Sequence, residues 1–235
     1  MAGKLYGVSV GPGDPGLITI KAKRCIEGSD IIAYPVKTPG EKSTAMEIVR
    51  QEMDLSGKRI EEIIFEMNPD TKIRESNYQD AIRKMADLLD EGDVAMITLG
   101  DATVYSTYMH VSLDISALGY ETETIPGVTS FCSGASEANI PLMIDNEGLA
   151  IVPMANDNDQ VQSALRDFDN IVVMKAFNSM EKLAAMMEEF GISRDKATVV
   201  SNVGMKEQYI GEMDLSRKYG YFTTVIIKKN GGRRT

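Results

Sequence analysis

Short apolar runs alternate with amphipathic runs along almost the whole chain. Apolar runs bounded by glycine, proline or polar residues are typical of buried strands, and apolar positions spaced three and four apart are typical of helices. In the first half, the pattern predicts strands at residues 4–10, 30–34, 59–64 and 94–98. It predicts helices at residues 17–27, 43–51 and 78–91, with a polar loop at 70–77. This alternation indicates an α/β fold with a largely parallel sheet.

The pattern changes beyond Gly119, where strands follow one another more closely. Strands are predicted at residues 121–125, 149–153, 170–174, 198–202, 208–212 and 222–228, and helices at 131–137, 159–168 and 179–190. Gly191 stands where a glycine commonly ends a helix. Because the last strands have no helix between them, they predict a mixed sheet. The sequence therefore predicts two α/β domains, residues 1–117 and 118–235.

Composition and charge narrow the class of protein. The 235 residues are 43% hydrophobic, enough for a sizeable core, and no apolar run has the length of a membrane span. A net charge of −10 argues against a nucleic-acid partner. The N-terminus lacks the pattern of a signal peptide and the two cysteines form no CxxC, so we expect a cytoplasmic protein. With a single histidine, His110, a histidine-rich metal site is excluded.

The first strand ends in a loop that spells G-x-G-x-x-G, from Gly11 to Gly16. A dinucleotide-binding loop would need backbone N–H donors and an acidic residue at the end of the second strand. Here Pro12 and Pro15 each remove a donor, and the second strand ends in AYPVK. Asp14 and Pro15 fit the cap and first residue of a helix. The loop is thus either a rigid turn or a backbone that a flat ligand approaches closely; a nicotinamide or flavin site is the weaker alternative.

Two further strands end in loops of similar composition. The fourth strand is followed by Gly100-Asp101 and a run rich in hydroxyl groups, and residues 121–125 are followed by Pro126-Gly127 and a helix of small residues. Each loop alone allows a packing interpretation, with Asp101 capping the next helix. Ligands bind at the carboxyl ends of strands in open α/β sheets. Three such loops together favour a shared ligand cleft.

The ordered segments VGPGDPGLITIKA, LGDATVYSTY and IPGVTS resemble those of the tetrapyrrole methylases, which use S-adenosylmethionine. The resemblance extends over essentially the whole chain. Within that family, GDATVYSTY, AYPVK and SFCSGASEANIPLMIDNEGLAIVP are most similar to the enzymes that methylate carbon 20 of precorrin-2 or cobalt-precorrin-2 (cobalt-factor II) in cobalamin biosynthesis. The chain departs from the family pattern at Ala102, where Gly-Asp-Pro is usual.

The resemblance implies a class III methyltransferase with an active-site cleft between its two domains, usually in a homodimer. It implies S-adenosylmethionine as the methyl donor, a tetrapyrrole substrate and no protein-bound metal. The implied donor contacts are Pro12, Gly100, Asp101, Ala102, Tyr105, Ser106, Thr107, Thr129, Ser130, Met174, Val203 and Gly204, with Thr223 and Thr224 at the adenine end. The resemblance also implies that the loop with Gly11, Gly13 and Asp14 faces the substrate. Lys37, just past a strand end, and His110 are further candidate substrate contacts.

The substrate carboxylates call for local positive charge in an acidic protein. The candidate cations are Lys21, Lys23, Arg24, Lys37, Lys175 and Lys206. Three alternatives remain open at this point. The first is another enzyme of the same fold, such as a uroporphyrinogen III methylase, another precorrin methylase or diphthine synthase. The second is a binding protein without catalysis, and the third is the dinucleotide enzyme.

Overall fold

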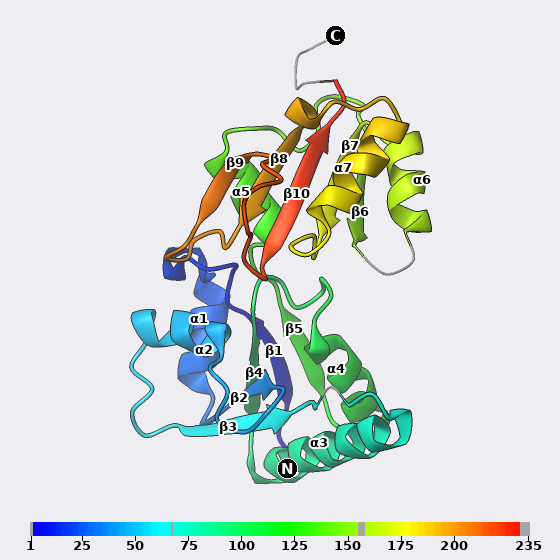
Figure 1. Cartoon of the computed structure of the whole chain (residues 1–235). Coiled ribbons are helices and arrows are strands. Elements are labelled where there is room, and N and C mark those ends of the chain that lie inside the picture. The colour runs from blue at the N-terminus through cyan, green and yellow to red at the C-terminus, as the bar shows by residue number, and fades with distance from the viewer. Residues whose placement is uncertain (1, 67, 155–157, 231–235) are drawn as a thin grey trace. The chain divides into compact units, whose positions relative to one another are not determined.

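The computed structural model describes residues 2–66, 68–154 and 158–230. The chain forms two compact units, Met1–Thr129 and Ser130–Thr235, each with its own sheet (Figure 1). The predicted boundary at residues 117 and 118 precedes strand β5 (Thr122–Ile125), which pairs with the first unit's strand β1 (Leu5–Ser9). No helix within the described residues is long and apolar enough to cross a membrane.

The first unit contains a five-stranded parallel sheet. Its other strands are β2 (Ile31–Val36), β3 (Arg59–Ile64) and β4 (Val94–Thr98), in the order β3-β2-β4-β1-β5. Its helices are η1 (Pro15–Leu17), α1 (Ile20–Gly28), α2 (Thr44–Glu52), α3 (Thr71–Glu91) and α4 (Thr107–Ala117). Alternate residues of β4 pack against α1 and α2 on one face and against α3 and α4 on the other. The sheet is therefore covered on both faces, as the alternation of apolar and amphipathic runs predicts.

The second unit contains a five-stranded mixed sheet, as predicted. Its strands are β6 (Leu149–Pro153), β7 (Asn170–Met174), β8 (Ala197–Ser201), β9 (Tyr209–Glu212) and β10 (Thr223–Lys228), in the order β6-β7-β10-β8-β9. Its helices are α5 (Ser130–Glu137), α6 (Asp159–Asp167), α7 (Met180–Glu189) and η2 (Arg194–Lys196). Of the neighbouring strands in this sheet, only the pair β6 and β7 is parallel; β10 runs antiparallel to both of its neighbours, and β9 runs antiparallel to β8.

Three helices differ from the sequence prediction. The loop predicted at residues 70–77 is wrong, because Asp70 caps α3 and accepts a hydrogen bond of 2.8 Å from the Lys72 N–H. The first turns of α3 are exposed and carry no apolar stripe, so periodicity missed them. Helix α4 went unpredicted for the same lack of a clear period. Asp14 and Pro15 begin only the short turn η1, and Thr19 caps α1.

Candidate functional site

Two glycine loops meet at the carboxyl edge of the first sheet. Strands β1 and β4 are parallel neighbours, so the loops that follow them leave the same edge. The Gly11 N–H donates to the Gly100 carbonyl at 3.2 Å, and the Gly100 N–H donates to the Gly11 carbonyl at 2.7 Å. Both residues have positive φ, +78° and +72°, which glycine adopts without strain. The backbone of these loops thus forms a two-residue bridge beyond the sheet.

The Asp101 side chain connects the loop after β5, which contains Gly127, to this bridge. One carboxylate oxygen, Oδ2, accepts a hydrogen bond of 2.8 Å from the Gly127 N–H, and the other, Oδ1, accepts from the N–H and hydroxyl of Thr103. The Asp101 side chain therefore does not cap α4, which begins at Thr107. The structure brings all three loops together, and Asp101 is the residue that joins them.

The environment of Asp101 keeps it ionised. Burial by itself raises the pKa of this carboxyl, since it disfavours the charge. The hydrogen bonds from Gly127 and Thr103 together outweigh burial and hold the pKa below its ordinary value. A charged acceptor makes a stronger hydrogen bond to a backbone N–H than a neutral one. The junction is therefore held by a charge-assisted contact at neutral pH.

The same junction is packed to contact distance. A Cβ atom on Gly127 would lie 2.4 Å from the Ser9 Cβ and 2.8 Å from the Gly100 carbonyl oxygen, so only glycine fits without a shift. The Ala102 N–H donates to the Ser9 hydroxyl at 2.8 Å, and the Ser106 hydroxyl donates to the Ala102 carbonyl. A proline at residue 102 would have no N–H for Ser9. Alanine at residue 102, where the Gly-Asp-Pro pattern has proline, thus supplies a hydrogen-bond donor to Ser9.

The sequence-predicted residues of the first unit differ in exposure. Buried ones are Gly11, Pro12, Gly13, Asp101 and Ala102; half-buried ones are Gly100, Ser106, Thr107 and Thr129; exposed ones are Asp14, Lys37, Tyr105 and His110. Lys37 directly follows β2 and so lies at the same sheet edge as the three loops. His110 lies on the exposed side of α4, away from any hydrogen bond to the junction among the described contacts.

The sequence-predicted residues of the second unit gather at one edge of its own sheet. Met174 ends β7 and pairs with Thr224 of β10, and Thr223 pairs with Ser201 at the end of β8. Val203 and Gly204 follow in the next turn, where Gly204 has a φ of +72°. Ser130 is the first residue of α5. This edge therefore carries the carboxyl ends of three strands and the start of β10.

Two serines matter that the sequence analysis did not single out. Ser9 is fully buried and supplies the acceptor for the Ala102 N–H. Ser201 is also buried; its hydroxyl accepts from the Gly220 N–H at 3.1 Å and lies 2.9 Å from the Thr223 hydroxyl. Each is a small polar residue at the end of an otherwise apolar strand, and this position is the signal that could have found them.

Two of the candidate cations are held in ion pairs. Lys21 lies 2.7 Å from Glu123, and Lys23 lies 3.5 Å from Glu52. Lys4, which was not a candidate, also pairs with Glu123 at 2.9 Å. Lys21 and Lys23 are thus each balanced by a carboxylate of their own unit.

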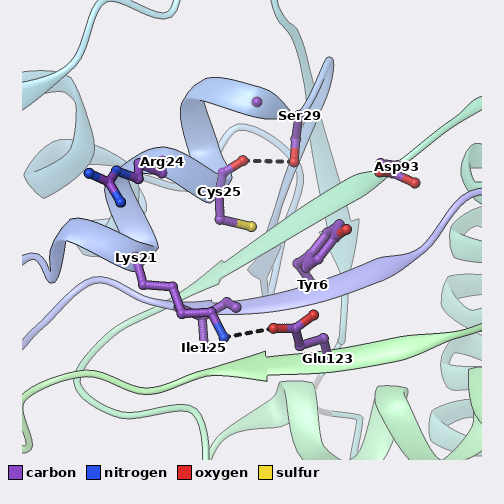
Figure 2. A pocket seen from close by; sticks show the side chains of 9 residues that line it. Tyr6, Lys21, Arg24, Cys25, Ser29, Asp93, Glu123 and Ile125 are labelled. Atoms are coloured by element: carbon purple, nitrogen blue, oxygen red, sulfur yellow. Dashed lines mark hydrogen bonds and ion pairs between the residues drawn. The ribbon is translucent and has the colours of Figure 1, made fainter.

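A pocket of about 310 Å³ lies between α1 and strands β1 and β5, apart from the three loops (Figure 2). Tyr6, Lys21, Cys25 and Glu123 are among the side chains that line it. Burial is the main cause that raises the pKa of the Cys25 thiol to about 11, which makes it a poor nucleophile at neutral pH. Across residues 2–66, 68–154 and 158–230, no group of three His, Cys, Asp or Glu side chains is placed to hold a metal ion.

Comparison with known proteins finds one family over most of the chain. The profile of the Tetrapyrrole (Corrin/Porphyrin) Methylases matches residues 4–218. A probable cobalt-precorrin-2 C(20)-methyltransferase of Methanocaldococcus jannaschii is 34% identical over 228 residues, 96% of each chain. The cobalt-precorrin-2 C(20)-methyltransferase of Salmonella typhimurium is 30% identical over 236 residues, 97% of this chain and 98% of that one.

A solved structure extends the similarity to the fold. The uroporphyrin-III C-methyltransferase of Thermus thermophilus, in complex with S-adenosylhomocysteine, superposes with a TM-score of 0.69 at 18% identity. The match covers 97% of this chain and 98% of that one, so both units share its fold. With a family profile that spans all but the two ends, the chain belongs to the tetrapyrrole (corrin/porphyrin) methylases.

Proposed function

We propose that this protein is an S-adenosylmethionine-dependent methyltransferase that methylates carbon 20 of precorrin-2 or cobalt-precorrin-2 in cobalamin biosynthesis. The observation that carries the proposal is the junction of three strand-end loops, joined by the Gly11–Gly100 bridge and the Asp101–Gly127 hydrogen bond. The two C(20)-methyltransferases that match nearly the whole chain support the choice of substrate and carbon.

The residues at the junction fit a donor that is bound through backbone groups. A Cβ on Gly100 would meet nothing within 4 Å, so the backbone at this residue is open to close approach. When bound, S-adenosylmethionine supplies a methyl group already activated on a sulfonium. The proposed contacts are those that the sequence resemblance implies, with Gly100 and Asp101 at the first sheet and Met174, Val203 and Gly204 at the second.

The chain's part in the reaction is then orientation. The substrate's electron-rich meso carbon is itself the nucleophile, so the protein need not supply one. Holding two reactants in line contributes roughly 7–11 kcal/mol of barrier lowering. The short hydrogen bonds around Asp101 serve this purpose, because they fix the loops before any ligand arrives.

We further propose that the protein works in the cytoplasm as a homodimer and holds no metal of its own. Any cobalt enters as part of the substrate. The support for these points is the family membership and the sequence features given above.

Calorimetric titration with S-adenosylhomocysteine tests the donor site, and precorrin-2 tests the substrate. The proposal expects saturable binding of both to the purified chain. Uroporphyrinogen III, titrated in parallel, is expected to bind more weakly. A preference for uroporphyrinogen III would assign the protein to a different branch of the family. No binding of S-adenosylhomocysteine would refute the donor site.

A further inference from the structure

Three aromatic side chains, two of them exposed and Phe177 half-buried, form a group at the carboxyl edge of the second sheet. The ring centroids of Phe177 and Tyr221 lie 5.1 Å apart, and those of Tyr221 and Phe222 lie 5.2 Å apart. Tyr221 is 58% exposed and Phe222 is 38% exposed. We name these three residues the aromatic platform. Large apolar side chains left open together commonly mark a binding surface.

The backbone beneath the platform is fixed on both sides. The Asn202 N–H donates to the Phe222 carbonyl at 2.9 Å, and the Ala176 N–H donates to the Thr223 carbonyl at 3.0 Å. The Gly220 N–H donates to the Ser201 hydroxyl at 3.1 Å. The platform is thus presented by a turn that is hydrogen-bonded to β8 and to the loop after β7. A rigid aromatic surface loses little conformational freedom on binding.

Gly220 lies close to a neighbouring side chain in this turn. A Cβ on Gly220 would lie 2.3 Å from the Asn202 side-chain nitrogen and 2.8 Å from its Cγ. The turn therefore packs directly on the side chain of Asn202, the residue that follows β8.

The platform is continuous with the proposed donor contacts of this unit. Phe222 directly precedes Thr223 and Thr224, and Thr224 pairs with Met174. Phe177 lies three residues after Met174 along the chain. A flat ligand on the platform would therefore lie beside the edge where the donor is proposed to bind.

Cationic residues follow the same loops. Lys175 stands between Met174 and Ala176 with a φ of +59°, Lys206 lies in the turn after β8, and Lys218 precedes Gly220; all three are exposed. An apolar centre with cations in the flanking loops matches a flat conjugated ring that carries carboxylates at its rim. S-adenosylmethionine has one aromatic group and a single carboxylate, and its adenine is small beside three rings.

We infer that the aromatic platform of Phe177, Tyr221 and Phe222 contacts the face of the tetrapyrrole macrocycle and contributes to substrate affinity. The inference rests on the proposed function and deepens it, because it assigns substrate contacts to residues outside the loop junction. It also separates the two ligands: the platform serves the macrocycle, and the neighbouring strand ends serve the donor.

The test compares Phe222→Ser and Tyr221→Ser with Phe190→Ser in the full-length protein. Phe190 is a matched control, since it is 37% exposed in the same unit but follows α7 at the other end of the sheet. Binding of cobalt-precorrin-2 is measured anaerobically by absorbance, and binding of S-adenosylhomocysteine by calorimetry. The two platform variants are expected to weaken macrocycle binding by about tenfold each, as loss of an aromatic contact predicts. Donor affinity and the Phe190→Ser variant stay within about threefold of the original protein.

The other outcomes each overturn the inference. Equal loss of S-adenosylhomocysteine binding would assign the platform to the donor. Unchanged macrocycle binding, with a dimer that dissociates in sedimentation, would make the platform an interface between two copies. Unchanged macrocycle binding, with a dimer that stays intact, would show that the three rings do not contact the substrate. If the unmodified protein binds S-adenosylhomocysteine but no macrocycle, the proposed substrate fails first and the inference falls with it.

Discussion

The Asp101 carboxylate accepts a 2.8 Å hydrogen bond from the Gly127 N–H, across 26 positions of the chain. The two residues belong to loops that follow different strands, β4 and β5, which are separated in the sheet by β1. The hydrogen bond therefore connects the loops after β4 and β5 across the carboxyl end of β1, the strand between them. In addition to its proposed contact with the donor, Asp101 thus has a positioning role, because its two side-chain oxygens accept hydrogen bonds from Gly127 and Thr103.

Replacing Asp101 by alanine should destabilise the first unit and weaken donor binding. The variant leaves the Gly127 and Thr103 N–H groups without their acceptor, which costs about 1–3 kcal/mol of unfolding free energy. We expect affinity for S-adenosylhomocysteine to fall by about tenfold or more, because the loops lose their fixed position. Urea unfolding and calorimetry measure the two effects.

Asp54→Ala is the matched control for this variant. Asp54 accepts from the N–H and hydroxyl of Ser56, two residues on, just as Asp101 does from Thr103, but it is exposed and has no distant partner in the described contacts. Its loss should change stability by less than about 0.5 kcal/mol and leave donor binding unaltered. Equal effects of the two substitutions would contradict the role given to the Asp101–Gly127 bond.

Ala102→Pro tests whether the hydrogen bond from the Ala102 N–H to Ser9 stabilises the protein. Proline removes the donor to Ser9, whose hydroxyl is fully buried, at a cost of about 1–3 kcal/mol. Ser9→Ala alone has a similar cost, because the Ala102 N–H is then left unpaired. The double variant should be more stable than the sum of the two losses predicts by about 1 kcal/mol. Additive losses in urea unfolding would show that this hydrogen bond has no part in stability.

Gly127→Ala tests the close packing at the junction. The new methyl group overlaps Ser9 and the Gly100 carbonyl, so the loops must separate, at a cost of about 1–3 kcal/mol. Gly28→Ala is the control, since a Cβ at that residue meets nothing within 4 Å. A helix favours alanine over glycine, so this control should be neutral or slightly stabilising. Similar thermal midpoints for the two variants would refute the packing argument.

Low pH should lower the folding stability of the first unit, because Glu123 becomes protonated. The hydrogen bonds from Lys21 and then Lys4 lower the pKa of Glu123 from its ordinary 4.5 to about 2. Since the folded pKa is the lower one, the stabilising contribution is complete above pH 4.5 and is lost as the pH falls toward 2. Glu123→Gln should therefore show a flatter loss of stability across this window.

The control for Glu123 is salt. Both lysines and the glutamate are partly exposed, so about 1 M sodium chloride should reduce the difference between Glu123→Gln and the original protein. Urea midpoints at several pH values between 2 and 6 measure it. A difference that persists unchanged at pH 2 would show that the pair contributes through packing.

The sequence predicted the strands well because most are short β-branched runs with clear ends. Residues 59–64, 94–98, 149–153 and 170–174 are strands with the predicted bounds. The sequence analysis did not predict the exposed start of α3 or the bounds of α4, since neither segment has a clear apolar period. For residue 102 the sequence showed a departure from the family pattern, but only the structure shows its partner, Ser9.

The sequence predicted that the three loops lie close together, because the carboxyl ends of parallel strands share one edge of the sheet. It did not predict which residue joins them. Asp101 fits both a helix cap and a ligand contact in the sequence. Its bond to Gly127 depends on the order of strands, which local pattern does not determine. The aromatic platform likewise depends on two distant segments that meet only in the folded sheet.

The most direct test of the proposed function is the position of the transferred methyl group. The protein is incubated anaerobically with cobalt-precorrin-2 or precorrin-2 and with S-adenosylmethionine that carries an isotope label in its methyl group. The account predicts one labelled methyl on the product, located at carbon 20 by NMR. A label at any other carbon, or turnover only with uroporphyrinogen III, would contradict it.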